Sequence, residues 1–140
     1  MDYKRIMGLD VGDKRIGVAV SDLLMITAQG IESYTRKTGE EDIAHLKKLA
    51  KDWQVYKVVC GLPVNMNGTI GEQAKKTQEF ADNLKEALGM EIDFFDERLT
   101  TASAERLLIE ADVRRSDRRK VVDKLAAVYI LQAYMDSMKK

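Results

Sequence analysis

The chain of 140 residues predicts an α/β domain built on a mixed five-stranded sheet. Three observations support this class. Strand-like patterns follow one another three times near the N-terminus, which indicates an antiparallel meander. Two units of helix followed by strand come next, and each such crossover adds a parallel strand. Helical periodicity then closes the chain. We therefore expect three antiparallel strands, then two parallel strands, flanked by helices.

Length and composition predict a single domain over residues 1–140 with an ordinary core. Hydrophobic residues make up 45% of the chain and charged residues 33%. Basic and acidic residues number 23 each, so a polyanion site must come from local clustering rather than from net charge. The single cysteine, Cys60, suits a reducing compartment. We find no signal peptide and no apolar run of about 20 residues, so we expect a cytoplasmic protein that does not enter a membrane.

The most informative segment is residues 7–22. Alternating apolar residues on both sides of a glycine-containing turn predict two strands. Asp10 lies within the apolar end of the first strand, where a carboxylate needs a partner, and a bound cation is the usual one. Lys14 and Arg15 follow on the turn, where a polyanion would meet them. Aspartate and glycine are also ordinary hairpin residues, so acids elsewhere must decide between a site and a simple turn.

The middle of the chain alternates between strand and helix patterns. Residues 25–33 predict the third strand. Residues 39–53 have helical spacing of apolar positions. The compact apolar run over residues 55–62 predicts a buried parallel strand. Thr69 and Glu72 form a T-x-x-E capping box, which predicts that the next helix opens there.

The C-terminal part predicts one more strand and two helices. Gly89 is expected to end the preceding helix, and residues 92–95 to form the fifth strand. Residues 99–111 have helical spacing, and residues 112–117 form a polar connection. The last helix is expected to start near Arg118 or Arg119 and to run to about Ser137, largely buried because it is apolar nearly all round.

Three acids stand at positions where elements begin or end. Asp10 ends the first strand and Glu97 follows the last one. Asp123 lies in the opening turns of the final helix, on the same side as Ala126 and Ala127. These small residues let the helix approach the sheet, which would bring Asp123 toward Asp10. Gathered carboxylates repel unless a divalent cation neutralises them, and all-oxygen ligation selects Mg²⁺ or Mn²⁺ over zinc. Each acid also has a purely structural interpretation.

Several residues are candidates for binding phosphate. Thr69 stands at a predicted helix start, where main-chain N–H groups bind anions; the alternative is an ordinary capped loop. Arg98 presents a planar fork suited to phosphate, or it neutralises Asp96. A dense basic cluster would offset repulsion between nucleic acid and the carboxylates, although such a run is often only a solvated face. The candidate residues of this cluster are Arg114, Arg115, Arg118 and Arg119.

Four motifs in order resemble the YqgF (RuvX) family of Holliday-junction-resolvase-like proteins, also described as pre-16S rRNA nucleases. These motifs are GLDVGDKRIGVAVSD, GLPVNMNGT, DERLTT and DKLAA. The match extends from Ile6 to about Tyr134, which is nearly the full chain.

The resemblance implies an RNase H-like fold and metal-dependent cleavage of structured nucleic acid in the bacterial cytoplasm. The implied role is trimming the 5′ end of pre-16S rRNA during ribosome biogenesis. By motif, the catalytic and metal-binding acids are Asp10, Glu97 and Asp123. Many nucleases of this fold use four acids, and no motif identifies a fourth here. The candidates for it are Asp22, Asp96 and Glu110.

Other functions remain open at the level of sequence. The same chemistry would serve a resolvase of four-way DNA, because shape and phosphates dominate recognition of both substrates. A non-catalytic RNA-binding or transcription-associated protein is a second alternative. A third is an ATPase of the actin, Hsp70 and sugar-kinase type, whose first motif is similar. The sequence is compatible with a monomer or a homodimer.

Overall fold

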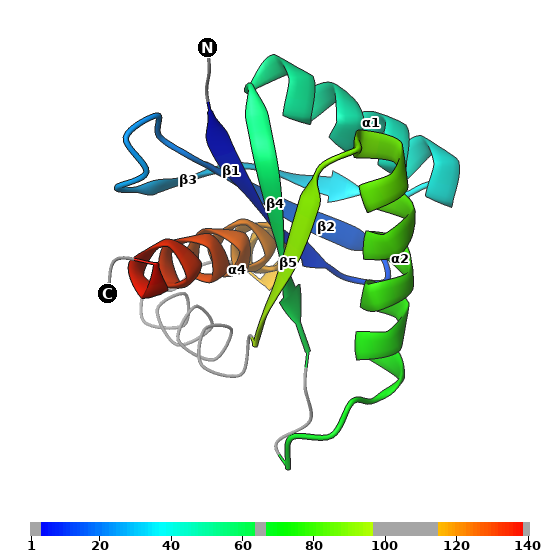
Figure 1. The fold of residues 1–140 in the computed structure, drawn as a ribbon. Helices are drawn as coiled ribbons and strands as arrows, with labels where there is room; N and C mark the ends of the chain where they lie inside the picture. The colour runs from blue at the N-terminus through cyan, green and yellow to red at the C-terminus, as the bar shows by residue number, and fades with distance from the viewer. Residues whose placement is uncertain (1–3, 64–66, 97–114, 139–140) are drawn as a thin grey trace.

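The computed structural model describes residues 4–63, 67–96 and 115–138 of the chain (Figure 1). Its five strands form one sheet in the order β3-β2-β1-β4-β5. The strands are β1 (Arg5–Val11), β2 (Arg15–Ser21), β3 (Ala28–Thr35), β4 (Val55–Leu62) and β5 (Glu91–Asp96). The described helices are α1 (Gly39–Asp52), α2 (Glu72–Leu88) and α4 (Arg115–Ser137).

The sheet is mixed, as the order of patterns along the chain predicts. β1 pairs with β2 and β2 pairs with β3 in antiparallel fashion. β4 is parallel both to β1 and to β5. The expected α/β class, with three antiparallel strands followed by two parallel strands, is therefore confirmed.

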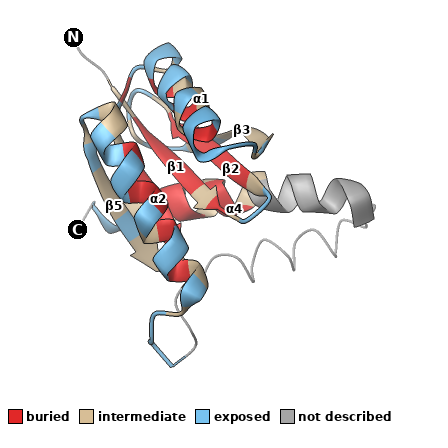
Figure 2. Cartoon of the chain, turned by 90° about the vertical axis from the view of Figure 1, so that its right-hand side faces the viewer, coloured by how far each residue is buried: buried red, intermediate tan, exposed pale blue. Residues whose placement is uncertain are grey.

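Different helices cover the two faces of the sheet. Side chains alternate along a strand, so Met7 and Leu9 of β1 pack toward α1 and α2, whereas Ile6 packs toward α4. Figure 1 shows α1 and α2 on one side of the strands and α4 on the other. In Figure 2 the buried residues gather on the sheet and on the helix sides that face it. Between Lys124 and Met135, α4 has no exposed residue, in agreement with the expected burial of the last helix.

A row of small residues lets α4 lie close to the sheet. The strand register aligns Gly8, Ala19 and Gly30 across β1, β2 and β3. A Cβ atom at Gly8 would lie 2.7 Å from the Cβ of Leu131 and 3.1 Å from the carbonyl oxygen of Ala127. Such distances are shorter than van der Waals contact, so α4 keeps this position only because residue 8 has no side chain.

Polar contacts connect the C-terminal half of α4 to the two edge strands of the sheet, β3 and β5. The Gln132 side chain accepts the N–H of Ala28 at 3.0 Å and donates to the carbonyl of Ile26 at 2.9 Å, beside β3. At the opposite edge, the Tyr134 hydroxyl donates to the Asp93 carboxylate of β5. The helix therefore spans the sheet with a polar anchor at each side.

The third strand starts later than the pattern predicts, at Ala28 instead of residue 25. The Asp22 carboxylate accepts the N–H groups of Ile26 and Thr27, at 2.7 and 3.1 Å. Met25 adopts a left-handed conformation with φ of 60°. These local bonds close a turn, so residues 25–27 are unavailable to the extended strand.

The last helix starts earlier than the sequence analysis places it. α4 begins at Arg115 and ends at Ser137. The polar residues 115–117 were expected in a connection, but arginine favours helix formation, so polarity alone does not exclude a helix there. The predicted helix over residues 99–111 lies outside the described residues. The bounds of α1, β4 and β5 agree with prediction to within one residue. Gly89 ends α2 as predicted, and it does so in the left-handed conformation.

Within the described part of the chain, no helix is both long enough and apolar enough to span a membrane.

Replacing Gly8 with alanine tests the close approach of α4. We expect Gly8→Ala to lower the free energy of unfolding by about 1–3 kcal/mol, because the added methyl group meets a main-chain carbonyl and a β-carbon that cannot rotate away. Urea denaturation followed by circular dichroism measures the change. Gly39→Ala is the matched control, since a Cβ at Gly39 meets nothing within 4 Å. Equal stability of the two variants would contradict the packing argument.

Candidate active site

The acid that the sequence singles out lies near the C-terminal end of β1. Asp10 is half-buried and shares its face of the sheet with Gly8, the face that α4 covers. Its partner across the β1–β2 pair is Gly17. On the other side, the parallel register of β1 and β4 pairs Leu9 with Cys60, the residues just before Asp10 and Gly61. On the β2 side, Gly17 places no side chain beside the Asp10 carboxylate.

The parallel strands β1, β4 and β5 end at the same edge of the sheet. β4 ends at Leu62, which pairs with Asp96 at the end of β5. Ligands bind at such carboxyl-terminal edges in open α/β sheets. Alternation along β5 places Phe95 with the cluster that packs on α4, so Asp96 lies on the opposite face from Asp10. The arrangement therefore disfavours Asp96 as a partner of Asp10.

Asp22, another candidate for a fourth acid, lies at the far end of the sheet. Because β1 and β2 are antiparallel and Met7 pairs with Val20, Asp22 lies beside the N-terminal end of β1, whereas Asp10 lies near its C-terminal end. Its carboxylate accepts the two turn N–H groups described above. It therefore closes the β2–β3 turn and is wrong as a ligand beside Asp10. Glu110, the third candidate, lies outside the described residues.

Some predicted site residues are only partly described or lie outside the description. Those outside it are Glu97, Arg98 and Arg114. Those on the described backbone of α4, without a description of their side chains, are Arg115, Arg118, Arg119 and Asp123. Among the described residues no three potential ligands gather into a metal-binding group. Asp10 offers the oxygen donor that Mg²⁺ and Mn²⁺ prefer, and neither cysteine nor histidine stands beside it on the paired strands.

The turn after Asp10 is tight and carries two cations. The Gly12 N–H donates to the Arg15 carbonyl at 2.9 Å. A Cβ at Gly12 would lie 2.9 Å from that same oxygen, so the turn needs glycine at this position. Lys14 is exposed and Arg15 is half-buried. Asp13 lies 3.7 Å from Lys76 of α2, an exposed pair that adds little stability.

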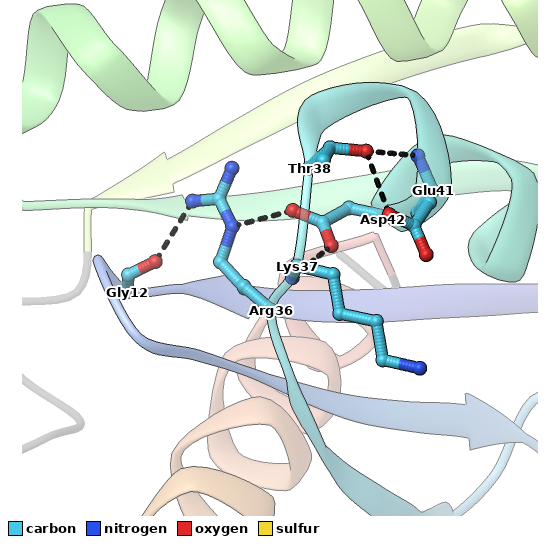
Figure 3. A network of polar contacts seen from close by, with 6 residues as sticks. All are labelled: Gly12, Arg36, Lys37, Thr38, Glu41 and Asp42. Carbon is cyan, nitrogen blue, oxygen red and sulfur yellow. Dashed lines mark hydrogen bonds and ion pairs between the residues drawn. The ribbon is translucent and has the colours of Figure 1, made fainter.

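Two residues outside the predicted set hold this turn (Figure 3). They are Arg36, in the loop after β3, and Asp42, in the first turn of α1. Arg36 follows β3, and its Nη1 donates to the Gly12 carbonyl at 2.9 Å. Its Nε donates to the Asp42 carboxylate, also at 2.9 Å. The main-chain N–H of Arg36 donates to the Lys14 carbonyl. An open pocket of about 500 Å³ lies between the turn and this loop.

Asp42 is a buried carboxylate with a full set of donors. Its side chain is 1% exposed. Burial by itself raises the pKa of this carboxyl, but hydrogen bonds from the Lys37 N–H and the Arg36 guanidinium outweigh burial and lower the pKa below its usual value. From sequence alone, an acid in the first turn of a helix is explained by its interaction with the helix dipole. The pattern R-x₅-D across the helix start, here Arg36 and Asp42, is the signal that would have identified this ion pair.

Thr69 does not cap α2. Its hydroxyl and its N–H both donate to the Asn67 side-chain oxygen, at 2.7 and 3.1 Å. The N-cap of α2 is Gly71, which has no capping side chain. The predicted T-x-x-E capping box is therefore wrong, because Asn67 forms a local turn with Thr69 first. Thr69 remains exposed on the loop that follows β4.

Cys60 takes no part in the site. It is fully buried in β4, and burial raises the pKa of its thiol to about 12. A thiol with that pKa stays protonated near neutrality, as a structural cysteine does.

Comparison with known proteins places this chain among nucleases. The family model RuvX, described as Holliday junction resolvase, matches residues 4–137. A relative from Clostridium novyi (strain NT) is 55% identical over 96% of this chain and 99% of its own length. One from Syntrophomonas wolfei is 55% identical over 94% of each chain. Both carry the name "Putative pre-16S rRNA nuclease".

Among solved structures, T. thermophilus RuvC in complex with a Holliday junction substrate has a similar fold. The TM-score is 0.60 at 12% identity, covering 99% of this chain and 98% of that one. At this identity the similarity concerns the fold alone. It bears out the expected RNase H-like architecture.

The low pKa of Asp42 predicts how stability changes with pH. The folded state lowers this pKa relative to about 3.9 in an unfolded chain. The ion pair therefore stabilises the fold above that pH, and its contribution is lost as pH falls through the lower, folded-state pKa. We expect Asp42→Asn to be less stable than wild type by about 1–3 kcal/mol at neutral pH, with a smaller gap in acid. Urea unfolding at several pH values measures the gap, and a gap independent of pH would contradict this account.

Proposed function

The chain belongs to the RuvX family of Holliday-junction-resolvase-like nucleases, and from that membership we propose that it hydrolyses phosphodiester bonds in structured nucleic acid with a divalent metal. The observation that carries the proposal is the position of Asp10. It stands near a parallel-strand end, on the face covered by α4, and its partner on β2 is Gly17. The preferred substrate is pre-16S rRNA, cut at its 5′ end in the cytoplasm.

The three acids of the proposed site are Asp10, Glu97 and Asp123. α4 crosses β1 at Gly8, where a Cβ atom would lie 2.7 Å from the Cβ of Leu131. Asp10 is two residues further along β1, or about 7 Å. Position 123 precedes Ala127, which contacts Gly8, by one helical turn. The close approach of α4 thus supports Asp123 as a partner of Asp10, and the family motif supports Glu97.

These acids suit a hard divalent cation. Carboxylate oxygens are the ligands that Mg²⁺ and Mn²⁺ prefer. Such an ion, when bound, lowers the pKa of water and neutralises charge on the phosphate. The chain itself contributes the placement of the acids: Asp10 is fixed by strand pairing on both sides, and position 123 is fixed by the packing of α4.

Cations around the acids would hold the phosphate backbone. Lys14 and Arg15 lie on the turn directly after Asp10. Thr69 lies on the loop after β4, at the edge of the sheet where Asp10 stands. The remaining residues of the proposed binding surface are Arg98, Arg114, Arg115, Arg118 and Arg119. Binding by such residues is electrostatic, so it depends on salt and carries little sequence information.

Two substrates have support. The curated relatives at 55% identity are named for pre-16S rRNA, and this favours RNA. The description of the family model favours four-way DNA as the second candidate. Both are branched or structured nucleic acids in which shape and phosphates dominate recognition.

Asp10→Asn tests the proposed reaction. We expect the variant to keep its fold and to lose cleavage, because an amide cannot replace the charge of the carboxylate toward a cation. Wild type and variant are offered 5′-extended pre-16S rRNA and a four-way DNA junction, with Mg²⁺, Mn²⁺ or a chelator. Gel analysis of the products ranks the two substrates.

The matched control is Asp82→Asn, an exposed acid on α2, the helix that covers the face of the sheet opposite to Asp10. Full activity of Asp10→Asn would contradict the assignment of the catalytic acid. Binding without cleavage of either substrate by wild type would instead favour the non-catalytic RNA-binding function.

Charge reversal tests the basic cluster as a binding surface. The residues to reverse are Arg114, Arg115, Arg118 and Arg119. We expect weaker RNA binding and a salt dependence reduced by roughly one unit of slope for each phosphate that the variant no longer neutralises. Fluorescence anisotropy at several salt concentrations, with chelator present, measures both. Reversal of the exposed α1 residues Lys47, Lys48 and Lys51 is the control. An unchanged slope in the cluster variant would assign these arginines to a solvated face.

A further inference from the structure

The Arg36–Asp42 pair connects the start of α1 to the β1–β2 turn. Arg36 bonds both carbonyls of the turn that follows Asp10: the side chain reaches Gly12 and the main-chain N–H reaches Lys14. One residue therefore holds the turn on each side of its tip. A turn fixed at two carbonyls has little freedom to change shape.

The guanidinium of Arg36 is itself held from three directions. Asp42 of α1 accepts its Nε at 2.9 Å. Phe80 of α2 lies under its plane, with 4.9 Å from Cζ to the ring centroid. The third contact is the Gly12 carbonyl. The planar fork of arginine allows this combination, whereas a lysine ammonium cannot bridge two acceptors in fixed directions.

Asp42 is committed to this arrangement. Its two oxygens accept from Arg36 Nε and from the Lys37 N–H, at 2.9 and 2.8 Å. A fully buried carboxylate with these partners is costly to place unless the geometry is maintained. Figure 3 shows the chain of contacts from the helix start through Arg36 to Gly12.

We infer that Arg36 and Asp42 are positioning residues of the nuclease site. They hold the β1–β2 turn, and with it the end of β1 that carries Asp10, in one shape, and this inference rests on the proposed function. Gly12 is two residues from Asp10, so a change in the turn moves the end of β1 directly. Displacements of about 1 Å at a reacting centre can reduce rates by about 10²-fold.

Two variants test this inference, Asp42→Asn and Arg36→Lys. Arg36→Lys keeps the positive charge but removes the simultaneous hydrogen bonds to Asp42 and to the Gly12 carbonyl. We expect kcat on 5′-extended pre-16S rRNA to fall at least about 10-fold in both, with KM within about twofold of wild type, because only the reacting geometry is disturbed. Asp52→Asn is the matched control, since Asp52 is an exposed acid in the last turn of the same helix.

A second measurement does not depend on activity. The Gly12 amide is protected by its bond to the Arg15 carbonyl. We expect hydrogen exchange at Gly12 to accelerate at least about 10-fold in both variants, relative to amides of the β1–β4 pair, and to stay unchanged in Asp52→Asn. A merely structural role would lower the unfolding temperature and leave kcat of the folded variants intact.

Unchanged exchange at Gly12 would overturn the inference, and so would faster exchange with wild-type kcat. If wild type cleaves neither substrate, the proposed function fails on its own. The affinity for Mn²⁺ in wild type and Asp42→Asn then decides the inference: weaker binding in the variant supports it, and equal affinity overturns it.

Discussion

The rest of the structure depends on the distance between α4 and the sheet. That distance is set at Gly8, where a single added carbon would overlap Leu131 and the Ala127 carbonyl. Because α4 packs so close to the sheet, Ile130, Leu131 and their neighbours contact the strands directly. The same approach places Ala127 and Leu131 against Gly8 of β1, and Lys124 and Val128 against Gly30 of β3. A packing constraint thus determines which polar groups can meet at the edge of the sheet.

Two carboxylates in the described part of the fold, Asp42 and Asp93, are held by specific partners. Asp42 is buried, yet it accepts bonds from a guanidinium and a main-chain amide. Asp93 is bonded by Tyr134 and lies 3.1 Å from Lys57 Nζ. Such pairs add modest stability, but each requires one geometry. They therefore fix the orientation of loops and helix ends more strongly than apolar contacts would.

The sequence predicts most of the fold because its signals are local. The run over β4 is flanked by glycine and proline, and the alternation in β2 is regular, so both were placed correctly. The start of β3 was missed because Asp22 closes a turn through bonds that no periodicity reveals. Arg36 was missed for a similar reason: one of its acceptors, Gly12, lies 24 residues away in a segment that only tertiary structure brings to it. Asp10 was identified because an acid at the end of an apolar strand can be recognised from the sequence alone.

The order of the elements along the chain has a further consequence. α4 comes last among the described elements, and its bond from Gln132 to Ala28 joins residues 104 positions apart. Contacts of such long range form slowly and late in folding. During synthesis the N-terminal strands emerge from the ribosome well before α4 does. A nascent chain therefore displays Asp10 on an uncovered sheet, without the helix that carries Asp123. On the proposed function, hydrolytic competence arises only after α4 has been synthesised and has packed on the sheet, which protects cellular RNA from cleavage by an incompletely folded nuclease.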